Sequence, residues 1–123
     1  MSAKKKQIRE DFRNAVFARD HHKCKFCGAT ENLDAHHITD RNDMPAGGYV
    51  VENGITLCPV HHEQAEVWHR TQGTKLAVGF TPPELYKKIF GTYEAAFKAS
   101  QRLAKKLGLE GEWESRGKDV LSQ

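Results

Sequence analysis

Residues 24–62, CKFCGATENLDAHHITDRNDMPAGGYVVENGITLCPVHH, hold all three cysteines of this 123-residue chain and four of its seven histidines. The stretch opens with Cys24-x-x-Cys27 and closes with Cys58-x-x-His61. Thiolate and imidazole are ligands that zinc prefers, and ligand pairs at this spacing are typical of a four-coordinate structural site. We therefore predict that these four side chains bind one zinc ion.

Four polar residues of the same stretch remain outside a complete zinc site: His36, His37, Asn53 and His62. The adjacent His61 and His62 leave the fourth zinc ligand ambiguous, because either imidazole can complete the set. The spacing favours His61; if His62 bound the zinc, His61 would be left for the other role. A purely structural zinc site does not need the additional histidines. We therefore expect this stretch to carry chemistry as well as structure.

Length and composition predict one small domain, residues 1–123, with a modest core that a structural metal would help to stabilise. No apolar run reaches the roughly 20 residues that a membrane helix needs, and no apolar segment follows the N-terminal lysines as in a signal peptide. The odd number of cysteines, in metal-type pairs, argues against a secreted disulfide framework. We expect a cytoplasmic protein with reduced, metal-bound cysteines and no membrane partner.

The net charge is +3, and basic residues are concentrated in the N-terminal 30 residues and in the C-terminal helical region. A basic surface attracts the phosphate backbone of nucleic acids without regard to sequence. The alternative is solubilising charge on exposed helix faces, and charge alone does not decide between the two interpretations.

Hydrophobic periodicity and turn residues predict an α+β arrangement of strand, loop, strand and helix between flanking helices. Pro59 suits the first turn of a helix, and Thr81-Pro82-Pro83-Glu84 predicts another helix start that includes a capping box. The expected elements are a basic N-terminal helix at about 8–19, strands at 33–38 and 54–58 around a loop at 39–52, a helix at 59–70, a C-terminal helical region at about 82–107 that breaks near Gly91, and a loose tail at 108–123.

The segments CKFCG (24–28), LDAHHI (33–38), ENGITLC (52–58) and PVHHE (59–63) resemble HNH endonucleases of the ββα-metal, or His-Me finger, superfamily, in the subgroup with a zinc knuckle. The resemblance covers about residues 24–70. It implies a ββα-metal core and hydrolysis of DNA phosphodiester bonds to 5′-phosphate and 3′-hydroxyl ends. It also implies a catalytic divalent metal ion, Mg²⁺, Mn²⁺, Ni²⁺ or Zn²⁺, beside the structural zinc.

The resemblance further implies roles for the residues outside the zinc set. His37 would be the general base that deprotonates water, and Asn53 would hold its imidazole in one orientation. His36 and His62 would bind the catalytic metal, with Glu66, one helical turn after His62, as a further candidate ligand. Alternation along the strand directs His36 and His37 to opposite sides, which agrees with separate roles. With an ordinary imidazole pKa, activity would rise through roughly pH 6–7 as His37 deprotonates.

Weaker candidates are Arg41, Lys23 and Lys25 as DNA-binding residues and His69 as an accessory contact. The resemblance implies DNA as the partner, and a homodimer is a further candidate. Small HNH proteins are often phage- or prophage-encoded, which suggests a phage packaging machinery as another candidate partner. Two other functions stay open. One is a zinc-stabilised DNA-binding module without turnover, and the other is a protein-interaction adaptor built on the zinc knuckle.

Overall fold

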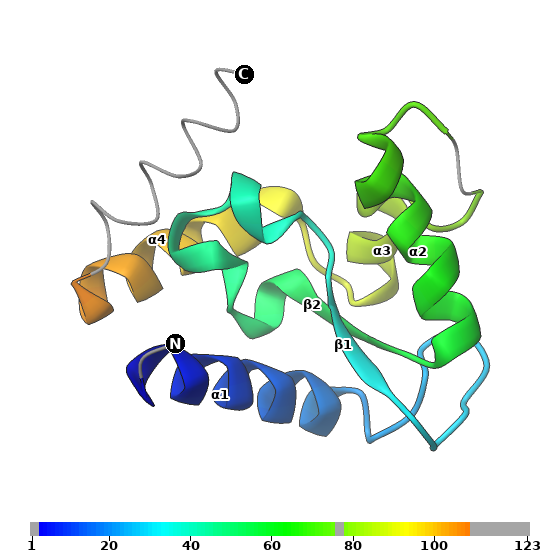
Figure 1. The fold of residues 1–123 in the computed structure, drawn as a ribbon, viewed down its shortest axis with the longest axis horizontal. Helices are drawn as coiled ribbons and strands as arrows, with labels where there is room; N and C mark the ends of the chain where they lie inside the picture. Colours follow the sequence, from blue (N-terminus) through cyan, green and yellow to red (C-terminus); the bar gives the residue numbers. More distant parts are fainter. Residues whose placement is uncertain (1–2, 76–77, 109–123) are drawn as a thin grey trace.

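The structure, a computed structural model, describes residues 3–75 and 78–108. Within these ranges it has four α-helices and a two-stranded antiparallel sheet, which confirms the predicted α+β class. Apart from Gly108, the tail expected at 108–123 lies outside the described residues. In chain order the elements are α1 (Ala3–Arg19), β1 (Asp34–His37), the 3-10 helices η1 (Arg41–Asp43), η2 (Pro45–Gly48) and η3 (Val51–Asn53), β2 (Gly54–Leu57), α2 (Pro59–Thr71), α3 (Pro82–Lys88) and α4 (Tyr93–Leu107) (Figure 1).

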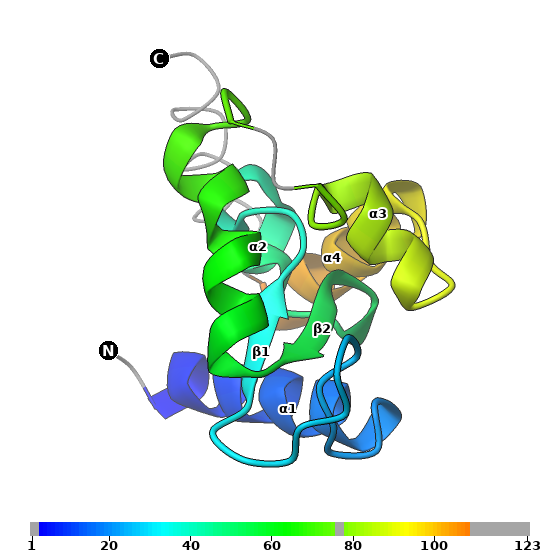
Figure 2. The ribbon, with the colours of Figure 1, turned by 90° about the vertical axis from the view of Figure 1, so that its right-hand side faces the viewer.

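The two strands pair antiparallel, with Asp34 opposite Leu57 and His37 opposite Gly54. Helix α1 runs along one side of the strands and α2 along the other, as Figures 1 and 2 show. All four residues of β2 are buried, because helices cover both faces of this strand. The strand, loop, strand and helix therefore follow one another in the predicted order.

Helix α1 packs on the sheet through one apolar stripe. Ile8, Phe12 and Val16, spaced four residues apart, are its buried residues. A Cβ atom at Gly54 would overlap the side chains of Val16 and Phe12, so glycine at this position lets α1 approach β2 closely. The sequence pattern predicted that this helix begins at about residue 8, but in the structure it begins at Ala3.

An ion pair fixes the C-terminal end of α1 to the sheet. Arg19 binds Asp20 through two hydrogen bonds of 2.8 and 2.9 Å. The same guanidinium donates to the carbonyl oxygens of Val51 (2.8 Å) and Gly54 (2.6 Å). The carboxylate of Asp20 also accepts a hydrogen bond from the backbone N–H of Thr56 at 2.9 Å. The end of α1 and the start of β2 thus form one hydrogen-bonded unit.

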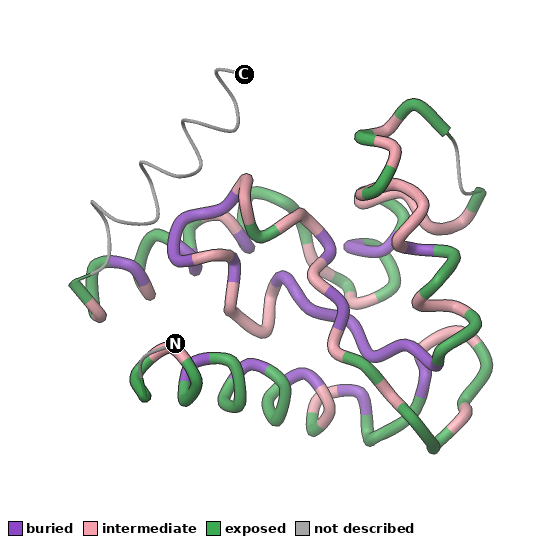
Figure 3. The backbone as a smooth tube through the Cα atoms, viewed as in Figure 1, coloured by how far each residue is buried: buried purple, intermediate pink, exposed green. Residues whose placement is uncertain are grey.

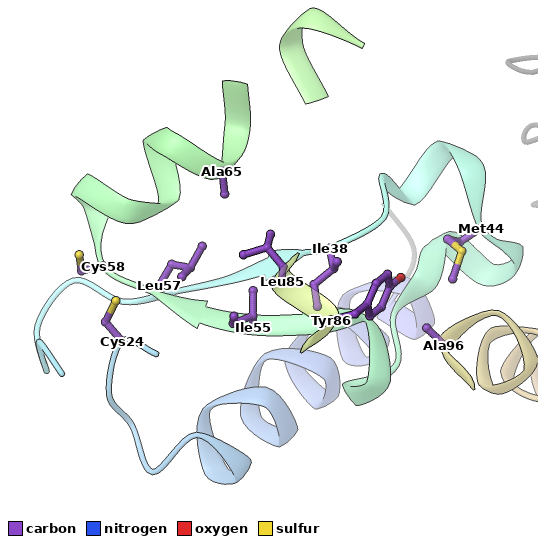
Figure 4. Packing of buried hydrophobic residues seen from close by; sticks show 10 residues of the cluster. All are labelled: Cys24, Ile38, Met44, Ile55, Leu57, Cys58, Ala65, Leu85, Tyr86 and Ala96. Atoms are coloured by element: carbon purple, nitrogen blue, oxygen red, sulfur yellow. The ribbon is translucent and has the colours of Figure 1, made fainter. Parts of the chain in front are cut away.

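The core lies between the sheet, α2 and α3. Figure 3 shows buried residues along β2 and on one side of α1. In Figure 4, Cys24 and Cys58 lie at one end of the core, and Met44 and Ala96 lie at the other. One end of the hydrophobic core is therefore made by two of the predicted zinc ligands. The buried members of this core are Cys24, Ile38, Met44, Ile55, Leu57, Cys58, Ala65, Leu85, Tyr86 and Ala96.

Helices α3 and α4 cover the long β1–β2 connection. Thr81 and Glu84 form the predicted capping box at the start of α3, and the break near Gly91 is confirmed by the separation of α3 from α4. Helix α4 contacts η2 and η3, where its small buried residues Ala96, Ala99 and Ala104 allow a close approach. Among the described residues, no helix has the length and apolar character needed to span a membrane.

Candidate metal centres

The first candidate centre lies at the start of α2, where Cys24, Cys27, Cys58 and His61 converge with all four ligand atoms within 4.8 Å of one another. Nδ1 of His61 lies 3.2 Å from Sγ of Cys58 and 3.5 Å from Sγ of Cys24. The Sγ atoms of Cys27 and Cys58 are 3.8 Å apart. Tetrahedral zinc holds sulfur and nitrogen ligands about 3.5–3.8 Å apart. The four side chains thus fit a metal ion such as zinc.

Backbone geometry of the CKFCG turn prepares Cys24 for metal binding. Gly28, with a φ of 77°, donates its N–H to the carbonyl oxygen of Cys24 and closes the turn. Burial alone would raise the pKa of Cys24, but backbone N–H groups, among them that of Phe26 at 3.4 Å, outweigh burial and lower this pKa to about 6. The metal-binding thiolate form is therefore favoured at neutral pH.

The second candidate centre lies between β1 and α2 and is made by His36, His62 and Glu66. Oε1 of Glu66 lies 3.2 Å from Nδ1 of His36 and 3.1 Å from Nε2 of His62. Nδ1 of His36 is buried and makes no hydrogen bond among the described residues. Its contact with Oε1 is therefore close in distance but does not have the geometry of a hydrogen bond. One ion bound at about 2.0–2.2 Å places its nitrogen and oxygen ligands about 3.0–3.5 Å apart. The three atoms fit this requirement.

Ionisation at the second centre also suits a metal. The close approach of His36 and His62 lowers the pKa of Glu66, which favours the carboxylate. Burial lowers the pKa of His36, which keeps its imidazole neutral. The contact with Glu66 raises the pKa of His62, so metal binding there would release a proton. His62 and Glu66 are only half-buried, and one side of the centre therefore faces solvent.

Asp34 supports the second centre, although it is not among the residues predicted from the sequence. Its Oδ2 lies 3.2 Å from Nδ1 of His62. A carboxylate at this nitrogen holds the proton on Nδ1 and leaves Nε2 free to bind a metal. The available signal was strand alternation, because Asp34 lies two residues before His36 on the same side of β1.

His37 lies on the other side of β1 from His36. Its ring stacks on Phe12 of α1 at 4.5 Å and meets Tyr49 edge-on at 4.6 Å. The ring of His36 instead stacks on His69 of α2 at 5.1 Å. The predicted separation of the two imidazoles is confirmed. Nε2 of His37 is buried and has no hydrogen-bond partner among the described residues.

The environment of His37 shifts its pKa well away from the ordinary imidazole value. Burial, followed by electrostatic effects of His36, Arg41, His69 and Arg9, lowers the pKa of His37 to about 3. The ring is therefore already neutral at pH 6–7, so the ordinary pKa on which the predicted rise of activity depended does not apply to the free protein. A neutral imidazole can still accept a proton, so the general-base role stays a prediction.

Asn53 does not hold the imidazole of His37, contrary to the prediction. Its Oδ1 accepts hydrogen bonds from the backbone N–H of Thr39 (2.9 Å) and the hydroxyl of Tyr86 (2.7 Å). Its Nδ2 donates to the carbonyl oxygens of Thr39 (3.0 Å) and Gly48 (3.1 Å). These four bonds use the full capacity of the buried amide. Asn53 thus fixes the loop that follows His37 rather than the ring itself.

The weaker candidates separate into two groups. Nε2 of His69 lies 2.8 Å from the carbonyl oxygen of His37, so His69 contacts the backbone of β1, and its accessory role stays a prediction. Arg41 reaches the hydroxyl of Tyr49 at 3.5 Å, beside His37. Lys23 and Lys25 flank Cys24 of the first candidate centre, and among the described residues no contact joins their side chains to His37.

Comparison of the chain with models of protein families, with curated proteins and with solved structures finds no match.

Proposed function

We propose that this protein is a metal-dependent endonuclease of the HNH, ββα-metal type that hydrolyses DNA phosphodiester bonds. The observation that supports this function is that the adjacent histidines His61 and His62, at the start of α2, belong to two different candidate metal centres. His61 joins the three cysteines, whereas His62 joins His36 and Glu66. A closed four-ligand set suits a structural zinc, and a half-exposed set of fewer protein ligands suits a catalytic ion with positions for water and substrate.

The residues divide the work of hydrolysis between two sides of β1. His37 takes a proton from the attacking water, whose oxygen forms the new bond to phosphorus while the bond to the 3′ oxygen breaks. A divalent ion held by His36, His62 and Glu66 would supply Lewis-acid stabilisation of the charge on the leaving oxygen. Asn53, through its bonds to the loop, keeps the chain after His37 in one conformation.

Plasmid nicking with added Mg²⁺, Mn²⁺ or Ni²⁺ tests this function. We expect His37→Gln to lower the nicking rate at least about 100-fold, the usual contribution of a general base, while keeping its zinc and its circular dichroism spectrum. His21→Asn, which changes an exposed histidine that already has a positive φ, is the control and should cut like the wild type. Wild-type nicking by a fully folded His37→Gln would refute the base assignment.

A DNA-binding module without turnover is the second candidate function. It is favoured by the packing of His37 between Phe12 and Tyr49, which leaves Nε2 buried. Salt-sensitive DNA binding by a zinc-loaded wild type that nicks with none of the three metals would select this function instead.

A further inference from the structure

We propose that Arg9 and Arg41 form a two-arginine clamp for one backbone phosphate of DNA, next to His37 and on the side of β1 that faces α1. This inference rests on the proposed function, because it identifies how the same site would hold its substrate. Arg41 is a candidate from the sequence, whereas Arg9 and the pairing of the two are evident only from the fold.

Tyr49 brings the two arginines together. The guanidinium of Arg9, on α1, lies over the ring of Tyr49 at 5.8 Å from its centroid. Nη1 of Arg41, in η1, lies 3.5 Å from the hydroxyl of the same tyrosine. That ring meets the imidazole of His37 edge-on at 4.6 Å. Two cations from distant parts of the chain thus reach one aromatic side chain that contacts the candidate base.

The charges of both arginines are available to a ligand. Arg9 and Arg41 are exposed, and within residues 3–75 and 78–108 neither has a carboxylate oxygen within 4 Å. Asp40, the acidic neighbour of Arg41, accepts a hydrogen bond from the backbone N–H of Asn42. By contrast, the guanidinium of Arg19 is hydrogen-bonded to Asp20 and to the backbone carbonyls of Val51 and Gly54.

Phosphate is the anion that this arrangement suits best. The planar guanidinium presents donors in a fork that matches two phosphate oxygens, and two such forks can hold one phosphodiester from different directions. The contact would carry no sequence information, since it involves only the DNA backbone. It would hold the strand where the water activated by His37 attacks.

Binding of a short fluorescent DNA duplex tests the clamp, measured by anisotropy at several salt concentrations with zinc-loaded full-length protein and no added divalent metal. We expect Arg9→Ala and Arg41→Ala each to weaken binding several-fold and to reduce the slope of log K against log salt by about 1, the value for one lost phosphate contact. Arg9→Lys should recover part of the affinity, because it keeps the charge and loses the fork.

Arg13→Ala is the matched control. Arg13 lies one turn along the same helix, carries the same charge and places its guanidinium over Phe17 at 5.1 Å. If Arg13→Ala weakens binding as much as Arg9→Ala, the effect is general charge and the clamp is refuted. Unchanged binding by Arg9→Ala with wild-type melting temperature and zinc content refutes it as well.

The same variants separate failure of the clamp from failure of the nuclease assignment. A wild type that binds DNA through Arg9 and Arg41 but nicks under no metal condition keeps the clamp and refutes the proposed activity. A wild type that nicks, together with Arg9→Ala and Arg41→Ala proteins that bind and nick equally well, refutes the clamp and keeps the activity.

Discussion

His36 and His37 are neighbours in the chain, yet their imidazoles stack on different helices. His36 lies 5.1 Å from His69 of α2, and His37 lies 4.5 Å from Phe12 of α1. Strand geometry requires this separation, because successive side chains of a strand point to opposite faces. One four-residue strand therefore contributes to two chemical environments, which substitutions can test one at a time.

The histidine doublet gives a sharp test of the metal assignment. We expect His61→Ala to lose the structural zinc and to unfold or melt far below the wild type, since small domains often depend on such an ion. His61→Cys should keep the zinc, because cysteine also binds it, and His62→Ala should keep the zinc and the fold. Zinc content by mass spectrometry and thermal melting measure both effects. Zinc loss in His62→Ala with retention in His61→Ala would reverse the assignment.

The contact between Asp34 and His62 predicts a selective effect on the second metal. Asp34→Asn removes the negative charge that holds the proton on Nδ1 of His62. We expect affinity for the added divalent ion to fall about 10–100-fold, the usual cost of losing a partner of a ligand histidine. Isothermal titration with Mn²⁺ or Ni²⁺ measures this, and zinc content should stay at the wild-type level. Glu63→Gln, on the exposed side of α2, is the charge-matched control.

The buried amide of Asn53 predicts a stability effect. Asn53→Ala leaves the backbone N–H and C=O of Thr39 and the carbonyl oxygen of Gly48 without their partner, whereas the hydroxyl of Tyr86 keeps its contact with Oγ1 of Thr39 at 2.7 Å. Each unsatisfied buried group costs about 1–3 kcal/mol, so the loss of three partners should lower the free energy of unfolding by at least about 3 kcal/mol. Denaturant unfolding measures the loss. Tyr86→Phe removes one of the four bonds of Asn53, together with the contact between the hydroxyl and Oγ1 of Thr39, and should cost less; an equal or larger cost would contradict the network.

Asp20 predicts how stability depends on pH. Burial alone would raise the pKa of Asp20, but the hydrogen bond from Arg19 and that from Thr56 outweigh it, and the pKa falls below the ordinary value of 3.8. A carboxyl whose pKa is lower in the folded state stabilises the fold above its unfolded pKa. This contribution is complete at neutral pH and is lost as the pH falls below about 3.8.

Chemical unfolding of Asp20→Asn and the wild type at several pH values measures that contribution. The stability difference between them should be constant from pH 7 to about pH 5 and shrink at lower pH. Asp11→Asn, an exposed position on α1, serves as the control and should show no comparable difference. A difference that grows as the pH falls would contradict the assignment.

The features predicted correctly from the sequence depend on residue type and short spacing. Cys24, Cys27, Cys58 and His61 form two local pairs, and the pairing of β1 with β2 brings the pairs together. The separation of His36 and His37 follows from alternation in one strand. The break near Gly91 follows from the turn chemistry that separates α3 from α4.

The features that the sequence did not predict depend on packing between distant elements. Asn53 turns toward Thr39 and Gly48 because the β1–β2 connection folds into three 3-10 turns, with Ala46 at a φ of 52° that no sequence pattern announces. The low pKa of His37 arises from the approach of α1, which places Phe12 on the ring. Propensity and motif spacing contain no information about either contact.

The adjacency of His61 and His62 has a thermodynamic consequence for metal loading. Under the proposed function, one helical turn supplies ligands to two ions. The ion that binds first orders this turn, so binding of the second ion loses less conformational entropy. Linkage then requires each ion to raise the affinity for the other by the same factor. As zinc is removed, activity would therefore fall more steeply than the fraction of zinc-loaded protein. The second ion would bind well only to protein that already holds zinc.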